Sequence, residues 1–194
     1  MLAERGIEVV VEAPRRLHAI LRSAPGVARL VAKGEPPGRI DACARMLSLP
    51  GYFGTTLESI PASVSYLEPE PARVERWRSE LARVAGFKVG IAWQGNRKFG
   101  NDAGRSIPLR HFEALARVPG VRLVSLQKND GAEQLSQWAG ATPVLDVGDI
   151  DTADAFVDTA ALIRSLDLVI TSDTSLAHVA GAMGAPVWLA LGHV

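Results

Sequence analysis

Short apolar runs rich in β-branched residues alternate with amphipathic stretches along the second half of the chain. Runs of this kind, bounded by glycine, proline and polar residues, predict buried strands. Strands are expected at 88–93, 121–126, 144–146, 166–171 and 185–191. Helices are expected at 108–117, 131–138, 152–165 and about 174–184, and a long polar loop at 94–106. This alternation over short links predicts an α/β fold with a doubly wound, Rossmann-like parallel sheet.

The first 85 residues give a more broken pattern. Strands are expected at 7–11, 27–32 and 45–50, a helix at 14–21 and a short capped turn at 54–61. An amphipathic helix from about 72 to 84 carries a charged, solvated face. We place a domain boundary near residue 85. Residues 1–85 are interpreted as the remainder of a second α/β domain, and 86–194 as a C-terminal domain.

The junction at Ser172, Asp173, Thr174 and Ser175 is the main candidate site. It follows a buried strand, and its residue types are those that begin helices. A helix that begins at the carboxyl end of a parallel strand presents free amide groups and the positive end of its dipole. Such a position suits a phosphate or diphosphate.

The loop after the strand at 88–93 is a second candidate, because open α/β sheets bind ligands at the carboxyl ends of their strands. It contains Gln94, Gly95 and Asn96, and further on Arg105. Glycine allows close backbone approach to a ligand, and an arginine can meet phosphate oxygens. For every residue of this loop except Arg105, the alternative is an ordinary mobile basic loop without a ligand.

Two further loops follow predicted strands. One supplies Gln127 and Lys128, which can hydrogen-bond a base or ribose. The other holds the string Asp149-Ile150-Asp151, a pattern that some sugar transferases use to bind a divalent ion. Two carboxylates are too few oxygen ligands for such a site. We therefore favour a capping role, with Thr152 or Asp151 as the cap of the helix at 152–165.

His178 lies one helical turn after Thr174, so the two side chains share a face. Two interpretations stay open. The imidazole is either packed at the helix start and hydrogen-bonded to a carbonyl, or placed beside a bound diphosphate or sugar.

Composition narrows the function classes. Lys and Arg number 21, as do Asp and Glu, and this balance argues against a nucleic-acid-binding protein. Cys43 is the only cysteine, which excludes an intrachain disulfide, and a small core residue is expected there. No apolar run is long enough for a membrane span and no secretory signal is present, so we expect a cytoplasmic protein. Dinucleotide, Walker and nucleophile-elbow motifs are absent.

Several ordered blocks resemble the C-terminal half of glycosyltransferase family 9, which includes the heptosyltransferases. The blocks are 89–96, 105–109, 124–128, 158–163 and 167–184, and 54–61 resembles the end of the family's N-terminal domain. The closer likeness is to bacterial proteins that fuse tetratricopeptide repeats to such a domain.

The resemblance implies a GT-B architecture, in which two Rossmann-like domains face each other across a cleft. The C-terminal domain would hold a nucleotide-sugar. The amides of Thr174 and Ser175 would bind the diphosphate, and Asp173 would contact the donor sugar or orient the loop. Arg105 would meet phosphate, and Gln127 with Lys128 would border the nucleoside. Electrostatic stabilisation of the leaving diphosphate would need no metal or other cofactor.

The sequence departs from the family pattern at both ends. The family's acceptor-side base lies before the strand matched by 7–11, and the family continues beyond residue 191, so we expect a truncated chain whose catalytic residues are unassigned. The expected function is the donor-binding part of a glycosyltransferase that acts on a glycan or protein acceptor. The alternative is a non-catalytic nucleotide-sugar-binding or scaffold module. A GT-B-like epimerase would need carboxylates and histidines from both domains, which we do not find.

Overall fold

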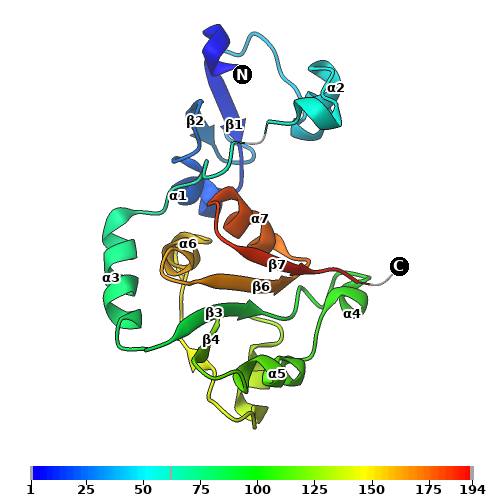
Figure 1. Cartoon of the computed structure of the whole chain (residues 1–194). Helices are drawn as coiled ribbons and strands as arrows, with labels where there is room; N and C mark the ends of the chain where they lie inside the picture. The colour runs from blue at the N-terminus through cyan, green and yellow to red at the C-terminus, as the bar shows by residue number, and fades with distance from the viewer. Residues whose placement is uncertain (1, 62, 193–194) are drawn as a thin grey trace.

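The computed structural model describes residues 2–61 and 63–192. Two β-sheets, each made of parallel strands, lie one above the other, and helix α3 (Pro71–Leu81) lies at one side of the lower sheet (Figure 1). The upper sheet has two strands, β1 (Val9–Glu12) and β2 (Val27–Val31), which pair in parallel. The short helices η2 (Arg15–Leu17) and α1 (His18–Leu21) connect them. This β–α–β unit confirms the elements expected at 7–11, 14–21 and 27–32.

The lower sheet has five parallel strands in the order β5-β4-β3-β6-β7. The strands are β3 (Phe87–Ala92), β4 (Val121–Ser125), β5 (Leu145–Asp146), β6 (Leu168–Ser172) and β7 (Val187–Ala190). All five strands expected in this half of the chain are confirmed. The apolar character of β3, β4 and β6 reflects their burial inside a parallel sheet, whereas β5 and β7 at the two edges are only partly buried.

Helices cover both faces of the lower sheet, which confirms the doubly wound fold. They are α4 (Asp102–Arg105), η5 (Leu109–Phe112), α5 (Glu113–Ala116), η6 (Ala132–Gln137), α6 (Val157–Ile163) and α7 (Ser175–Ala182). One core lies between the sheet and α3, α6 and α7, and includes Trp77 and Leu162. The other lies under η5 and α5, around Trp93 and Phe112. Figure 1 shows α6 and α7 between the lower sheet and the upper unit.

The upper unit is attached through α7 and the segment before α6. Ile20 of α1 belongs to the same core as Trp77. The amides of Tyr66 and Leu67 both donate to the carbonyl of Ala182, at 2.8 and 3.1 Å. These bonds satisfy the carbonyl of the last residue of α7, a group that a helix end leaves without a partner.

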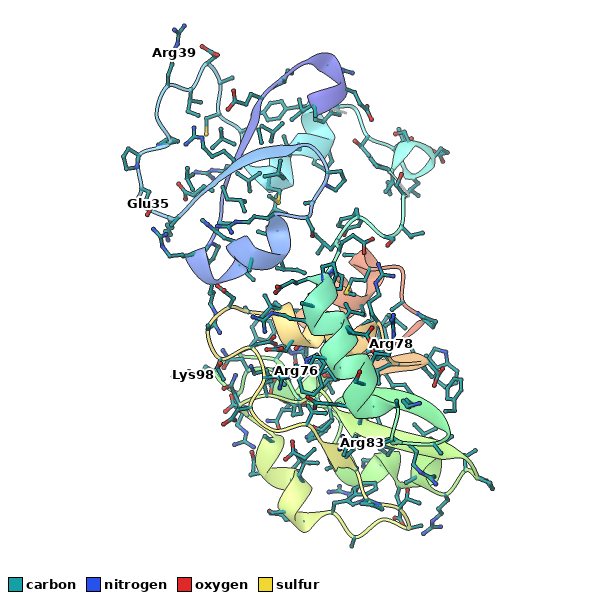
Figure 2. All side chains as sticks on the ribbon, turned by 90° about the vertical axis from the view of Figure 1, so that its left-hand side faces the viewer. Glu35, Arg39, Arg76, Arg78, Arg83 and Lys98 are labelled. Atoms are coloured by element: carbon teal, nitrogen blue, oxygen red, sulfur yellow. The ribbon has the colours of Figure 1, made fainter. Side chains whose placement is uncertain are left out.

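The charged face of α3 is solvated, as expected. Arg76 pairs with Glu80 and Arg78 with Glu75, and both arginine side chains are well exposed (Figure 2). Exposed pairs of this kind contribute little to stability. The buried side of the helix carries Trp77 and Leu81.

The prediction of a strand at 45–50 is wrong. The segment forms the short helices η3 (Met46–Ser48) and α2 (Leu49–Tyr52), with Pro50 in the first turn of α2. Proline lacks the amide that a strand ladder needs but fits the first turn of a helix. Cys43 was expected in the core and is exposed. The capped turn at 54–61 is confirmed as η4 (Leu57–Ser59), with a capping box between Thr56 and Ser59.

The helix expected at 152–165 begins only at Val157. Residues 152–156 are irregular, and Phe156 has a positive φ of 65°. Asp151 nevertheless acts on this helix, because its carboxylate accepts the amides of Asp158 and Thr159 at 2.6 and 3.1 Å. The Asp151 carboxylate therefore binds the start of the helix from the other side of residues 152–156, and not from the residue directly before the helix.

Asp158 joins three elements within the core. Its Oδ1 accepts hydrogen bonds from Arg73 Nη1 at 3.0 Å and from Trp77 Nε1 at 3.2 Å, both on α3. Its Oδ2 accepts the amide of Asp151 at 3.1 Å. Burial would raise the pKa of Asp158, but these hydrogen bonds and the Arg73 charge outweigh it, and the pKa lies below its ordinary value.

Asp158→Asn should lower the free energy of unfolding by about 2–3 kcal/mol, because the variant removes the anion that Arg73 and Trp77 share. Urea denaturation at neutral pH measures the loss. Asp149→Asn, on an exposed residue of the preceding loop, is the matched control and should stay close to the parent. An unchanged midpoint for Asp158→Asn would contradict the assigned role.

The stabilisation due to Asp158 should also depend on pH. A carboxyl group whose pKa is depressed by folding stabilises the protein above its ordinary pKa of 3.8, and loses that effect as the pH falls through the depressed value. The gap in unfolding free energy between the parent and Asp158→Asn should therefore narrow between about pH 5 and pH 2. A gap that widens in acid would contradict the prediction.

Candidate functional site

The strand order places two loops at a topological switch point. From β3 the chain moves outward to β4 and β5, then returns to pair β6 on the other side of β3. Ligands of open α/β sheets bind where the order reverses, beyond the carboxyl ends of the strands. The loop after β3 and the turn between β6 and α7 flank this point.

In the turn before α7, the amides of Ser175 and Leu176 have no hydrogen-bond partner among the described residues. Thr174 is the N-cap residue, with an extended backbone, and its side chain makes no capping bond. Its Oγ1 instead lies 3.3 Å from Thr171 Oγ1. The first helical turn therefore begins without a side-chain acceptor for the amides of Ser175 and Leu176, which have no intrahelical partner. Ser175 is exposed, so this end of the helix meets solvent.

Ser172 and Asp173 precede these amides. Ser172 is fully buried, and among the described residues its Oγ has no hydrogen-bond partner. Asp173 is exposed. Its carbonyl accepts a hydrogen bond from Arg105, and in the described part of the chain its carboxylate has no partner.

Arg105 links the two loops across the switch point. Its Nη1 donates to the carbonyl of Asp173 at 2.9 Å, and its Nε donates to Asp102 Oδ1 at 3.2 Å. The guanidinium carbon lies 4.5 Å from the centre of the Phe99 ring. The structure thus brings Arg105 and the α7 turn together, as the sequence predicted for a phosphate site.

The absence of a side chain at Gly95 leaves space for the guanidinium of Arg105. A Cβ atom at this position would lie 2.4 Å from Arg105 Nη2 and 2.5 Å from Asp102 Oδ1. Any larger residue would therefore displace the ion pair from the loop. Asp102 and Phe99 were missed as site residues, although the spacing of Asp102 and Arg105, three apart, is typical of an ion pair on a helix.

Gln127 bonds to the backbone of both neighbouring loops. Its Oε1 accepts the amides of Trp93 and Gln94 at 2.8 and 2.9 Å. Its Nε2 lies within bonding distance of the carbonyls of Gln94, Lys128 and Asp130, at 2.9, 3.2 and 2.7 Å. Both lone pairs and both amide hydrogens of the side chain are thereby occupied. In this arrangement Gln127 holds the ends of β3 and β4 in place.

Lys128 points to the loop after β5. Its ammonium donates to the carbonyl of Ile150 and lies 3.8 Å from Asp151 Oδ2. The Asp151 carboxylate also accepts the hydroxyl of Thr159 at 2.5 Å. The Asp151 carboxylate therefore binds the first turn of α6, which agrees with the capping role that we favoured over a metal site. Within the described residues, no three His, Cys, Asp or Glu side chains are grouped as a metal site.

The remaining candidates lie at the edges of the site. His178 is exposed, so the interpretation of a packed imidazole at the helix start is wrong. Asn96 is also exposed, and its Oδ1 accepts the amide of Lys98 at 2.8 Å. Gln94 is half-buried and its Oε1 accepts a bond from Gln134 Nε2 at 3.1 Å.

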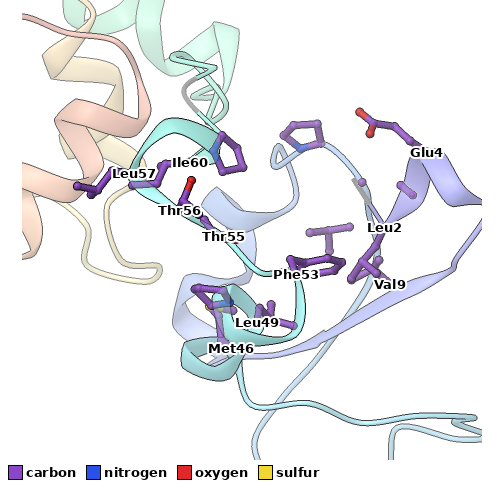
Figure 3. A pocket seen from close by; sticks show the side chains of 16 residues that line it. Leu2, Glu4, Val9, Met46, Leu49, Phe53, Thr55, Thr56, Leu57 and Ile60 are labelled. Carbon is purple, nitrogen blue, oxygen red and sulfur yellow. The ribbon is translucent and has the colours of Figure 1, made fainter.

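The structure has two notable cavities, and only one of them borders the loop after β3. One, of about 450 Å³, is bordered by Gln94, Phe99, Asp102 and Gln134. The other, of about 1100 Å³, lies in the upper unit and is lined by apolar side chains such as Val9, Leu49 and Phe53 (Figure 3). Neither of these two cavities is lined by residues 172–175.

Comparison with known proteins identifies the architecture. The structure superposes on a glycosyltransferase of family 9 from Veillonella parvula with a TM-score of 0.68 and 14% sequence identity, over 96% of this chain and 73% of that one. The chain has the GT-B fold. Escherichia coli heptosyltransferase WaaC, solved with ADP-2-deoxy-2-fluoro heptose, aligns with a TM-score of 0.48 and 16% identity, over 97% of this chain and 63% of that one.

One curated protein is similar in sequence. FlbA of Caulobacter vibrioides is 31% identical over 140 residues, which is 71% of this chain and 24% of FlbA. The chain thus spans about a quarter of the length of this relative. No model of a protein family matches the sequence. In the helical parts described by the structure, no helix has both the length and the hydropathy to cross a membrane.

In this GT-B chain, Gln127→Ala should lower the free energy of unfolding by about 2–4 kcal/mol, because it leaves the amides of Trp93 and Gln94 without an acceptor. Chemical denaturation measures the effect. Gln137→Ala, at an exposed position on η6, is the control and should change stability little. Equal stability of the two variants would show that the amide of Gln127 does not hold the loops.

Proposed function

We propose that this chain is the donor-binding part of a glycosyltransferase and holds a nucleotide-diphosphate sugar at the turn before α7. The observation that carries the proposal is the bond from Arg105 to the Asp173 carbonyl. It places a guanidinium beside unbonded helix amides at the switch point of the sheet. The fold shared with a family 9 glycosyltransferase supports the choice of ligand.

The chemistry proposed for the site is electrostatic. Breaking the bond between a sugar and a diphosphate concentrates negative charge on the leaving phosphate. Amides of Ser175 and Leu176 and the guanidinium of Arg105 are donors already fixed in place for that charge, so they need no rearrangement as it develops. We propose that transfer is metal-independent and uses no cofactor, because these groups supply the positive charge themselves.

Other residues would define the rest of the donor site. Ser172 and Thr174 would line the diphosphate turn, with His178 at its rim. Asp173 would contact the donor sugar through its exposed carboxylate. Lys128 would border the nucleoside, whereas Gln127 would act by holding Gln94 and its loop. Gly95 and Asn96 would allow the ligand to approach the backbone.

For the complete polypeptide we propose sugar transfer to a glycan or protein acceptor, by a heptosyltransferase-like enzyme of the bacterial cytoplasm. The motif resemblance to tetratricopeptide fusion proteins supports this context.

A non-catalytic nucleotide-sugar-binding module is the second candidate. It is favoured by the absence of an assigned base among the residues that the structure describes.

Isothermal titration with UDP-, ADP- and GDP-sugars tests donor binding, and release of free sugar tests turnover. We expect binding to persist in the presence of EDTA. Binding with sugar release supports the transferase, and binding without it supports the module. Absence of binding to all of these nucleotides would overturn the proposal.

Asp173→Ala should abolish binding of the nucleotide-sugar while leaving the thermal unfolding midpoint unchanged. The variant keeps the carbonyl that Arg105 binds and removes only an exposed carboxylate. A loss of at least about ten-fold in affinity, equivalent to about 1.4 kcal/mol, is expected by titration. Asp149→Ala, on another exposed aspartate, should bind as the parent does. Equal affinity of the Asp173 variant and the parent would rule out the assigned contact.

A further inference from the structure

Lys128 holds a segment that lies between the lower sheet and the upper unit. The segment comprises residues 150–156, which follow β5 and lead into α6. The Lys128 ammonium donates to the carbonyl of Ile150 and lies 3.8 Å from Asp151 Oδ2. We propose that Lys128 is a positioning residue, which fixes the upper unit through this segment and loosens it when a nucleotide takes up the ammonium.

Residues 150–156 contact the upper unit in two ways. The amide of Ala155 donates to the carbonyl of Arg16 in η2 at 2.7 Å. Ile150 is 4% exposed and belongs to the same buried cluster as Ile20 of α1. Ala155 is itself buried, so its amide depends on Arg16 for a hydrogen bond. The position of this segment therefore helps to fix η2 and α1 on the lower sheet.

The backbone of the segment is held in an unfavourable shape. Asp151 and Phe156 have φ values of 54° and 65°, in the left-handed region that residues other than glycine rarely adopt. Such conformations persist only where the surrounding contacts fix them. At Asp151 these contacts are the two amides bound by its carboxylate and the nearby ammonium of Lys128. Removal of the ammonium should therefore allow the segment to relax.

The ammonium is accessible to a ligand. The side chain of Lys128 is 33% exposed, whereas that of Asp151 is only 4% exposed. The Ile150 carbonyl is a neutral acceptor, and an ammonium bonds more strongly to an anionic one. The ammonium cannot stay on this carbonyl while it follows a ligand outward. Residues 150–156 and a nucleotide would therefore compete for the same group.

The inference rests on the proposed function for the identity of the ligand. Lys128 follows β4, at the edge of the sheet where the nucleotide-sugar would bind. Withdrawal of the ammonium from Ile150 would loosen residues 150–156 and, with them, the bond between Ala155 and Arg16. Linkage then requires that firm attachment of the upper unit weakens nucleotide binding by the same factor.

Amide hydrogen exchange, followed by NMR on the whole chain, tests the positioning role. The Ala155 amide should exchange about five-fold faster in Lys128→Met, which keeps the aliphatic chain and removes the ammonium. The amide of Leu126, which donates to the Ile91 carbonyl in the lower sheet, should keep its rate because the sheet stays folded. Lys98→Met, at an exposed lysine, is the matched control and should resemble the parent at both amides.

Unchanged exchange at Ala155 in Lys128→Met would overturn the positioning role. An equal rise at Ala155 and Leu126 would also overturn it, because global unfolding would then explain both rates.

The nucleotide arm uses whichever of the UDP-, ADP- and GDP-sugars binds the parent by titration. At saturation it should accelerate exchange of the Ala155 amide in the parent and have no further effect in Lys128→Met. A nucleotide-sugar that binds but leaves the Ala155 rate unchanged would overturn the coupling. If none of them binds, the proposed function fails, whereas faster exchange in Lys128→Met would still support the positioning role.

Discussion

Parallel pairing of β3 with β6 is the constraint on which the arrangement of the site depends. The register runs from Val89 opposite Leu168 to Ala92 opposite Thr171, so the two strands end level with each other. Their following loops must therefore meet at one edge. Arg105 closes the short distance between them, and Gln127 keeps the loop after β3 against the end of β4. The candidate donor site follows from this pairing together with these two side chains.

The apolar pattern predicted the lower sheet well for a physical reason. The central strands β3 and β6 are largely buried and leave an apolar run in the sequence, and each of the five predicted runs corresponds to a strand. Elements near the surface were harder to predict. At 45–50 an apolar run forms two short helices, and Leu47 is 96% exposed. Trp188 on the edge strand β7 is likewise 62% exposed.

Polar contacts between distant residues explain the other differences. In the first turn of α6, the amide of Asp158 donates to Asp151, seven positions earlier in the chain, a separation that no local capping rule covers. The many bonds of Gln127 are likewise invisible in sequence, because they depend on how β3 and β4 are aligned. Arg105 was predictable as a cation near the site. Asp102 could have been inferred from its spacing to Arg105, whereas the contact with Phe99 depends on the folded loop.

Helix α7 has contacts of different kinds at its two ends. Its first turn carries the unbonded amides of the candidate site, and its last carbonyl is held by Tyr66 and Leu67. Eight residues of α-helix span only about 12 Å. The helix is therefore a short rigid rod between the segment that leads from the upper unit and the place where the donor would sit. A tilt of one sheet relative to the other would therefore change the orientation of those amides.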